Sequence, residues 1–419
     1  MAHYAAHGAS ADTAERLSTF HSLKFPDYRN LWLGQVGASA SMWMEQIARP
    51  LLILELTDSG LMLGLLAATR MLPQLLIGIW AGVLADRMDK KKLLGASQFV
   101  TFAMHLLTAL LLLGGVIEVW MVFLTTFISG SSMAFNQPAR QSLIAQLVPP
   151  SSLHNAVALN SAAVNFMRIG GAGFAGFLVA FLDFGEIYLI QALIYVGVIY
   201  TTIRITAKHD AKPRKNRGSM REEMVQGFAV AKRDKIIFYI LVLTLVIFLF
   251  GMPYQSVFVP LLAEDKLGLN KSGVGFMIAF VGMGALVGSL SVATIGNTIR
   301  NRGYIMIGLL CVYSFALFAL ANAPTIYLAI PALVISGAMQ TSFMSINNAF
   351  VLGRTDSEYH GRIMSLFSLD RGLLPMGAAL GGLLSEIIGP SAGLMLMASC
   401  CLIVTLIIAV FVPSIRRIE

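Results

Sequence analysis

Two carboxylates stand inside stretches of sequence that are otherwise almost free of charge. Glu45 precedes Arg49 by four residues in one such stretch, and Asp370 stands directly before Arg371 in another. Residues four apart share one face of a helix, so Glu45 and Arg49 can pair there. A buried carboxylate that gains and loses a cationic partner can bind and release a proton. Glu45 and Asp370 are therefore the candidates for proton exchange.

Other polar side chains in the apolar stretches could line a cavity and hold the oxygens of a substrate. Each such charge costs a few kcal/mol at the centre of a bilayer and usually faces the protein interior. The alternative is a set of structural ion pairs that fix helix register. The substrate-cavity candidates are Arg49, Arg70, Arg168, Arg371, Asn136, Gln340 and Asn347. The amides of this group, with Gln137 and Asn348, are either pore-lining donors or caps at an inner mouth. His105 is expected to be a histidine whose hydrogen bonds are satisfied in the interior.

The elements that carry these residues must be membrane helices. The chain has 419 residues, of which 57% are hydrophobic and 12% charged, and its mean hydropathy is +0.75. Soluble domains are about 25% charged. Apolar runs of about 20 residues cross a bilayer as helices, because lipid cannot satisfy backbone polar groups. Twelve spans are expected, at 30–56, 60–85, 93–115, 119–138, 155–182, 186–206, 236–263, 273–297, 303–322, 325–349, 361–387 and 390–412.

Basic residues set the expected orientation. If the N-terminus is cytoplasmic, all but six of the 30 lysines and arginines fall in inner segments. Cytoplasmic loops carry an excess of these residues, which places both termini in the cytoplasm. The net charge of +8 is then a topology signal, and no nucleic-acid partner is expected. The first 28 residues lack a removable signal peptide, so we expect a multi-pass protein of the inner (plasma) membrane.

The chain divides near a polar run, "KHDAKPRKNRGSMREE", which predicts a cytoplasmic linker followed by a short amphipathic helix. Short similarities in the same order, such as "FNQ" at 135–137 and "INN" at 346–348, indicate two related halves. Parallel repeats build a central site between two bundles in transporters. The expected organisation is a tail (1–28), an N-terminal six-helix bundle (29–206), the linker (207–235), a C-terminal six-helix bundle (236–412) and a tail (413–419).

Several classes of chemistry find no support in the sequence. Cys311, Cys400 and Cys401 fall inside predicted spans without metal-ligand spacing, so packing is their expected role. No Walker-type loop, nucleophile elbow or zinc helix occurs. We therefore expect no enzymatic activity, no metal and no cofactor.

One charged loop between two spans matches a known motif. "GVLADRMDKKK" resembles the loop after the second helix of the major facilitator superfamily, whose pattern runs G-x-L-a-D-R-x-G-R/K-R/K; Asp89 replaces its second glycine. The segments "FNQPARQSLIAQLVPPSSLHNAVALNS" and "MRIGGAGFAGFL" are similar to the drug:proton antiporters that include macrolide-efflux and enterobactin-export proteins. The residues that match the motif are Gly82, Leu84, Asp86, Arg87, Lys90 and Lys91.

The resemblance implies an all-α membrane protein of twelve transmembrane helices in two pseudo-symmetric six-helix bundles. It implies that Asp86 engages the start of the eleventh helix, near "HGRIMSLF", when the cytoplasmic gate is shut. In the antiporter branch an arginine precedes a Gly-Pro-x-x-x-Gly run. Arg168 holds that place here, and Gly171 replaces the proline.

The expected function is secondary transport by alternating access, as proton-coupled efflux of an amphipathic small molecule, a drug or a siderophore-like compound. The expected partners are that substrate, protons and the lipid bilayer, with the protein active as a monomer. A lipid flippase, a solute importer on the same fold and a non-transporting membrane sensor are the alternatives.

Overall fold

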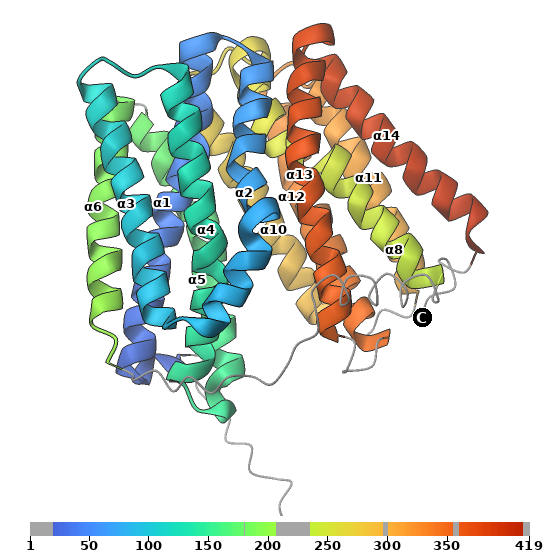
Figure 1. Cartoon of the computed structure of the whole chain (residues 1–419). Coiled ribbons are helices and arrows are strands. Elements are labelled where there is room, and N and C mark those ends of the chain that lie inside the picture. The colour runs from blue at the N-terminus through green and yellow to red at the C-terminus, as the bar shows by residue number, and fades with distance from the viewer. Residues whose placement is uncertain (1–19, 180, 207–234, 296–300, 355–359, 414–419) are drawn as a thin grey trace, which may run out of the picture.

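The computed structural model describes residues 20–179, 181–206, 235–295, 301–354 and 360–413. Within these ranges, the side chains of residues 79–87 and 360–372 lie outside the description. The predicted linker helix therefore falls outside the described residues. Every regular element of the described chain is helical (Figure 1).

Helices cover almost all of the described chain. The first half comprises η1 (His21–Lys24), α1 (Pro26–Thr57), α2 (Gly60–Arg87), α3 (Lys90–Leu113), α4 (Val119–Leu147), η2 (Pro150–Ser152), α5 (Leu153–Val179) and α6 (Phe184–Ile203). The second half comprises α8 (Lys235–Val246), η3 (Ile247–Gly251), η4 (Tyr254–Phe258), α9 (Val259–Leu261), η5 (Leu262–Lys266), α10 (Lys271–Ile295), α11 (Arg302–Asn322), α12 (Ile326–Arg354), α13 (His360–Ile388) and α14 (Pro390–Phe411).

These helices overlap all twelve predicted spans, with the seventh formed by the elements from α8 to η5. In the described part of the chain, nine helices are long and apolar enough to cross a membrane. The remaining long helices are α1, α5 and α13. Helix α1 carries Glu45 and Arg49, α5 carries Arg168, and α13 carries Asp370 and Arg371.

The helices gather in two bundles that lie side by side (Figure 1). In the first bundle α1 packs against α5 and α6, while α3 lies between α4 and α6. In the second bundle α12 packs against α10 and α11, and α14 packs against α11 and α13. We call these the N bundle (α1–α6) and the C bundle (α8–α14).

The seventh span is wound differently from the others. The helix widens to π turns at η3, η4 and η5, and Met252 N–H donates to the Ile247 carbonyl five residues back. Pro253 has no N–H to donate, and its ring crowds the preceding turn. Single π turns are frequent at functional positions of helices.

The two bundles meet through α2 with α13 and through α5 with α10. The described contacts lie toward the upper end of Figure 1, where α2 begins and α13 ends. A Cβ placed on Gly64 of α2 would lie 2.7 Å from the Cα of Gly382 in α13, which real Cβ atoms essentially never do. A Cβ on Gly176 of α5 would lie 2.8 Å from the Cα of Gly275 in α10. Glycine therefore allows the backbones of the two bundles to touch at this end.

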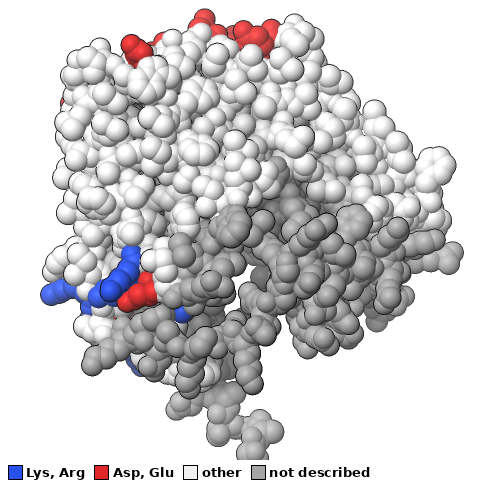
Figure 2. Space-filling view, viewed as in Figure 1, with Lys and Arg blue, Asp and Glu red and all other residues white. Residues whose placement is uncertain are grey.

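A band of uncharged surface separates the charged ends of the molecule. Figure 2 shows acidic side chains gathered along the upper edge and basic ones near the lower edge. The exposed large hydrophobic residues of the described chain include Phe99, Leu110, Phe177 and Phe315. Apolar side chains around a bundle suit contact with lipid tails.

Candidate functional site

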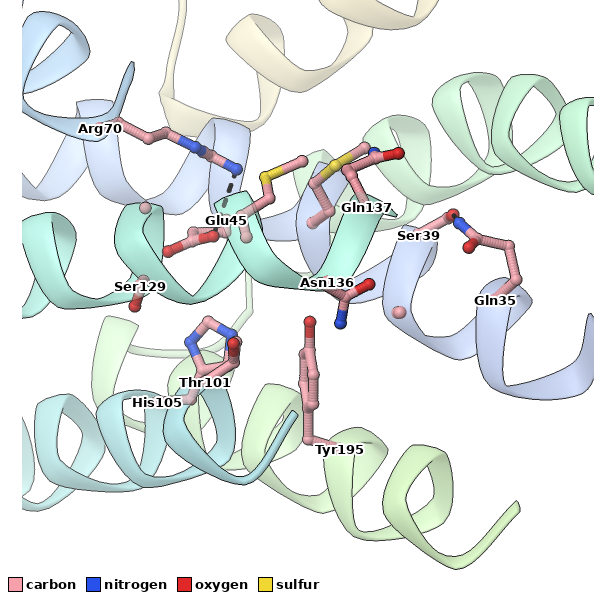
Figure 3. Close-up of a pocket in the computed structure, with 14 residues that line it drawn as sticks. Gln35, Ser39, Glu45, Arg70, Thr101, His105, Ser129, Asn136, Gln137 and Tyr195 are labelled. Atoms are coloured by element: carbon pink, nitrogen blue, oxygen red, sulfur yellow. Dashed lines mark hydrogen bonds and ion pairs between the residues drawn. The ribbon is translucent and has the colours of Figure 1, made fainter. Parts of the chain in front are cut away.

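A polar cavity of about 70 Å³ lies inside the N bundle. It has room for several water molecules, since one water needs roughly 10–15 Å³ by the same measure. Figure 3 shows its polar side chains pointing inward from α1, α2, α3, α4 and α6. Those residues are Gln35, Ser39, Glu45, Arg70, Thr101, His105, Ser129, Asn136, Gln137 and Tyr195.

Glu45 is the carboxylate of this cavity, and Arg49 pairs with it as the spacing predicts. One turn of α1 separates the two residues, and Arg49 Nη2 lies 2.6 Å from Glu45 Oε1. Glu45 is 6% exposed and Arg49 2%, so the pair is shielded from bulk solvent. A buried pair of this kind loses its hydration, and additional polar contacts must replace it.

Arg70 supplies a second cation to the same carboxylate. Its Nη2 lies 3.3 Å from Glu45 Oε2, and its Nη1 donates to Gln46 Oε1 at 2.8 Å. The Arg70–Glu45 ion pair joins α2 to α1, as the dashed line in Figure 3 shows. The sequence placed Arg70 among the cavity cations but gave no indication of its partner.

Arg49 is anchored on its far side by α4 and α6. Its Nε donates to the Tyr188 hydroxyl at 3.2 Å, its Nη1 donates to the Thr126 hydroxyl, and the guanidinium lies 5.6 Å from the centre of the Tyr188 ring. Because these contacts immobilise Arg49, it orients Glu45 in this conformation. Arg70 has fewer partners and more exposure, with 16% of its side chain accessible.

His105 of α3 lines the same cavity, yet its hydrogen bonding is incomplete. Nε2 lies 3.5 Å from the Ser41 hydroxyl, whereas Nδ1 is buried and has no hydrogen-bond partner among the described residues. The expectation of a satisfied interior histidine therefore holds for one ring nitrogen and not for the other. The rings of Tyr188 and Tyr195 lie 6.0 and 5.4 Å from the imidazole.

Sequence reasoning missed most hydroxyl groups of the cavity. Ser and Thr are common in membrane helices, where they bond to their own backbone, so single occurrences carry no signal. One available signal was spacing: Gln35 and Ser39 are four apart and hydrogen-bonded at 2.7 Å, and Thr101 stands four before His105. Polar residues at such spacing mark one wet face of a span.

A smaller cavity of about 40 Å³ lies where the two bundles meet. Its wall includes Gln46, Arg49, Arg70 and Thr126 of the N bundle and Ser256 of η4 in the C bundle. Arg70 borders both cavities. Its guanidinium thus stands between the carboxylate and the boundary of the two bundles.

Three polar residues that the described part of the C bundle places near this boundary, Tyr254, Gln255 and Gln340, are uncharged. Gln255 Nε2 donates to the Tyr254 hydroxyl at 3.1 Å and to Gln340 Oε1 at 3.2 Å. Ser336 of α12 bonds to the same Tyr254 hydroxyl at 3.2 Å. These contacts tie η4 to α12 and fix Gln340 beside the seventh span.

The remaining cavity candidates occupy different settings. Asn136 donates to the Ser97 hydroxyl at 3.2 Å and borders the N-bundle cavity. Asn347 is fully buried within the C bundle, donates to the Thr244 hydroxyl at 2.9 Å, and lines neither of the two cavities described above. Arg168 of α5 is half-buried, and its Nε has no hydrogen-bond partner among the described residues.

The charged loop between α2 and α3 is a tight turn in which an aspartate replaces glycine. Asp89 is the N-cap of α3, and its carboxylate accepts from the backbone N–H of Lys91 and Lys92. Its φ of −61° needs no glycine. Lys91 Nζ donates to the carbonyls of Ile203 and Ile205, at the end of α6, at 2.9 and 2.5 Å.

Several predicted residues have no described side chain. The gating residues Gly82, Asp86 and Arg87 lie in the last turns of α2. Asp370 and Arg371 lie in α13, where the description of side chains begins only at residue 373. Their predicted roles remain hypotheses.

Comparisons with known proteins identify the same superfamily that the motif in the loop between α2 and α3 resembles. The model of the family described as "Transmembrane secretion effector" matches residues 17–419, almost the whole chain. The protein belongs to this family of major facilitator transporters.

The relatives of this chain include named transporters. It is 23% identical over 401 residues to macrolide efflux protein A of Streptococcus pyogenes, covering 94% of this chain and 97% of that protein. It is 22% identical to the staphyloferrin A transporter of Staphylococcus aureus, covering 88% and 89%. The crystal structure of the nucleoside transporter NupG matches with a TM-score of 0.73 at 12% identity, covering 93% and 99%, which shows the shared fold. The protein is thus a multi-pass membrane transporter, and its family and relatives are not enzymes.

Proposed function

We propose that this transporter exports an amphipathic small molecule, drug-like or siderophore-like, by alternating access and in exchange for protons. The observation that carries the proposal is the setting of Glu45. Its carboxylate lies in a polar cavity and is shared by two arginines, of which Arg49 is the more buried and has the shorter contact, and Arg70 is the more exposed. Ionisable groups inside a membrane are costly, and they mark proton or substrate pathways.

Arg70 is the partner that can change. Its contact with Glu45 is longer than that of Arg49, and it also borders the cavity at Ser256 of the C bundle. Arg49 also borders that cavity, but Tyr188 and Thr126 of the N bundle hold its guanidinium. Movement of the C bundle would therefore change the surroundings of Arg70 more than those of Arg49. A carboxylate with one cationic partner binds a proton more readily than one with two.

Antiport requires the proton and the substrate to exclude one another. The arrangement of the bundles that lets Glu45 take up a proton would bind substrate in the N-bundle cavity less tightly. By linkage, bound substrate lowers the affinity of Glu45 for the proton to the same degree. In this conformation the cavity has room only for water, so the apolar part of an amphipathic molecule would lie along Met42 and Met133 of its wall once the bundles have moved.

The contacts between the bundles support alternating access. The glycine contacts of α2 with α13 hold the bundles together at the upper end of Figure 1, whereas Asp86 belongs to the opposite end of α2. We propose that the bundles 29–206 and 236–412 are the moving units. Asp86 would then close the lower end against the start of α13 when the upper end opens.

We propose that the lower end of Figure 1 faces the cytoplasm of a cell with this protein in its plasma membrane. Basic side chains at that end, among them Lys90 to Lys92 and Arg204, support this orientation. In a cysteine-free background, Glu118→Cys should react with an impermeant maleimide from outside. Ser219→Cys, in the linker, should react only after permeabilisation. Labelling of the linker position in intact cells would reverse the orientation.

Inverted vesicles with an imposed pH gradient test the function. Erythromycin, ethidium and a catecholate siderophore are the probes, and a pH-sensitive dye reports proton movement. We expect at least one probe to discharge the gradient in vesicles that contain the protein and not in vesicles that lack it. Glu45→Gln should abolish this discharge and spare downhill exchange of the same probe.

Three outcomes would contradict the proposal. Downhill flux of a probe without any proton movement would exclude proton coupling. Uptake by whole cells down a proton gradient would indicate an importer. Movement of a labelled phospholipid alone would indicate a flippase.

A further inference from the structure

His105 is a titratable residue for which the proposed exchange at Glu45 gives no role. The side chain is 1% exposed, and its Nδ1 has no hydrogen-bond partner in the described structure. Native proteins retain few buried polar atoms without a partner, and each one calls for a functional or structural reason. The nitrogen belongs to a side chain that lines the same water-sized cavity as Glu45.

The other ring nitrogen has a partner that tolerates a change of protonation. A serine hydroxyl can donate to a neutral imidazole nitrogen or accept from its N–H. Ser41 therefore satisfies Nε2 in either state of His105. A structural histidine needs only one of these states, whereas a histidine that exchanges protons needs both.

The charged and titratable groups around His105 come from three helices. Glu45 and Arg49 reach it from α1, Arg70 from α2, and Tyr188 and Tyr195 from α6. From α4 the cavity receives hydroxyl and amide groups, among them Ser129 and Asn136. Glu45 is thus the one described carboxylate within electrostatic reach of the imidazole.

Glu45 itself is poorly placed to receive a proton directly from bulk water. It is 6% exposed, and one of its oxygens faces each arginine. His105 is still less exposed, at 1%, so a proton would reach either group through the cavity that both line. Figure 3 shows His105 and Thr101 on the wall contributed by α3, across the cavity from Gln35 and Ser39 of α1.

We propose that His105 exchanges the coupling proton with Glu45 through water in the N-bundle cavity. The inference rests on the proposed proton coupling at Glu45. In the transfer an N–H bond of the protonated imidazole breaks, a water chain passes one proton on, and an O–H bond forms on the carboxylate. The products are a neutral imidazole and a neutral carboxyl group. No electrons are exchanged with any other species, and the total charge of the cavity is unchanged.

The test uses the full-length protein in inverted vesicles, with erythromycin as the probe, or ethidium if erythromycin is not transported. His105→Asn keeps a polar side chain and removes the titratable ring. We expect proton-driven flux to fall on the order of tenfold and its pH profile to lose one inflection. Downhill exchange should stay within about twofold, because the substrate still reaches Glu45.

A matched control lies on the same helix. Thr108 is buried one turn from His105 and bonds only to its own backbone, at the Met104 carbonyl, 2.8 Å away. Thr108→Val should leave both driven flux and exchange near wild type. If His105→Asn lowers exchange as much as driven flux, its role is packing and the relay is wrong.

A direct measurement does not depend on transport. The chain has seven histidines, and the NMR signal of His105 in ¹³C-labelled protein is identified by its loss in His105→Asn. Glu45→Gln should shift the titration midpoint of that signal, since two coupled groups influence each other reciprocally. An unchanged midpoint overturns the relay. If Glu45→Gln alone abolishes driven flux and His105→Asn does not alter it, the proposed function stands and the relay fails.

Discussion

The two bundles of the transporter share an arrangement of helices and differ in the chemistry of their interiors. In the N bundle, the cavity holds Glu45, Arg70 and His105, with Arg49 behind the carboxylate. Among the described side chains of the C bundle, the corresponding boundary carries the neutral groups of Tyr254, Gln255 and Gln340. Under the proposed coupling, this difference assigns the proton to the N bundle, and Asp370, whose side chain lies outside the description, is the competing candidate.

The largest expected effect separates Glu45 from Asp370, the deep carboxylate of the other half. Glu45→Gln should abolish accumulation driven by a pH gradient and spare downhill exchange, while Asp370→Asn should retain most of the driven flux. Driven and downhill flux in the same vesicles measure this. Glu186→Gln, at an exposed carboxylate in the first turn of α6, is the control.

The opposite pattern would move the coupling carboxylate to the C bundle. Driven accumulation that survives Glu45→Gln and fails with Asp370→Asn assigns the proton to Asp370. If neither substitution matters, the buried charges serve helix packing, and the contrast between the bundles has no role in coupling.

An intermediate effect is expected at the motif loop. Asp86→Asn should lower transport severalfold without altering insertion or substrate binding, because it weakens the state that is closed at the lower end. Asp89→Asn is a close control, since asparagine caps a helix as well as aspartate does. Equal transport rates in Asp86→Asn and wild type, at equal expression, would remove Asp86 from the gate.

The smallest effect is expected in the C bundle. Gln340→Leu removes the acceptor of Gln255 and should destabilise the protein by about 1 kcal/mol, the net worth of one buried hydrogen bond. Driven transport should fall by no more than about threefold. A loss as complete as that of Glu45→Gln would show that the neutral groups of the C bundle also take part in coupling.

The sequence predicts contacts between residues that are close along the chain better than other features of the structure. Asp89 illustrates a local limit. It replaces the second glycine of the motif, and only the structure shows that its side chain caps α3. The seventh span illustrates another, because apolar composition predicts a helix at 236–263 and cannot show the π turns around Pro253.

The sequence by itself determined the membrane class, the positions of the helices and the Glu45–Arg49 pair. Hydropathy is summed along the chain, and an i, i+4 contact depends only on the pitch of one helix. The tertiary structure alone decided that Arg70 completes the carboxylate site and that His105 shares its cavity. These contacts depend on how each helix is rotated about its axis and which helices are neighbours. Spans that are apolar on nearly every side carry little periodic signal of either, since lipid and protein interior favour the same residues.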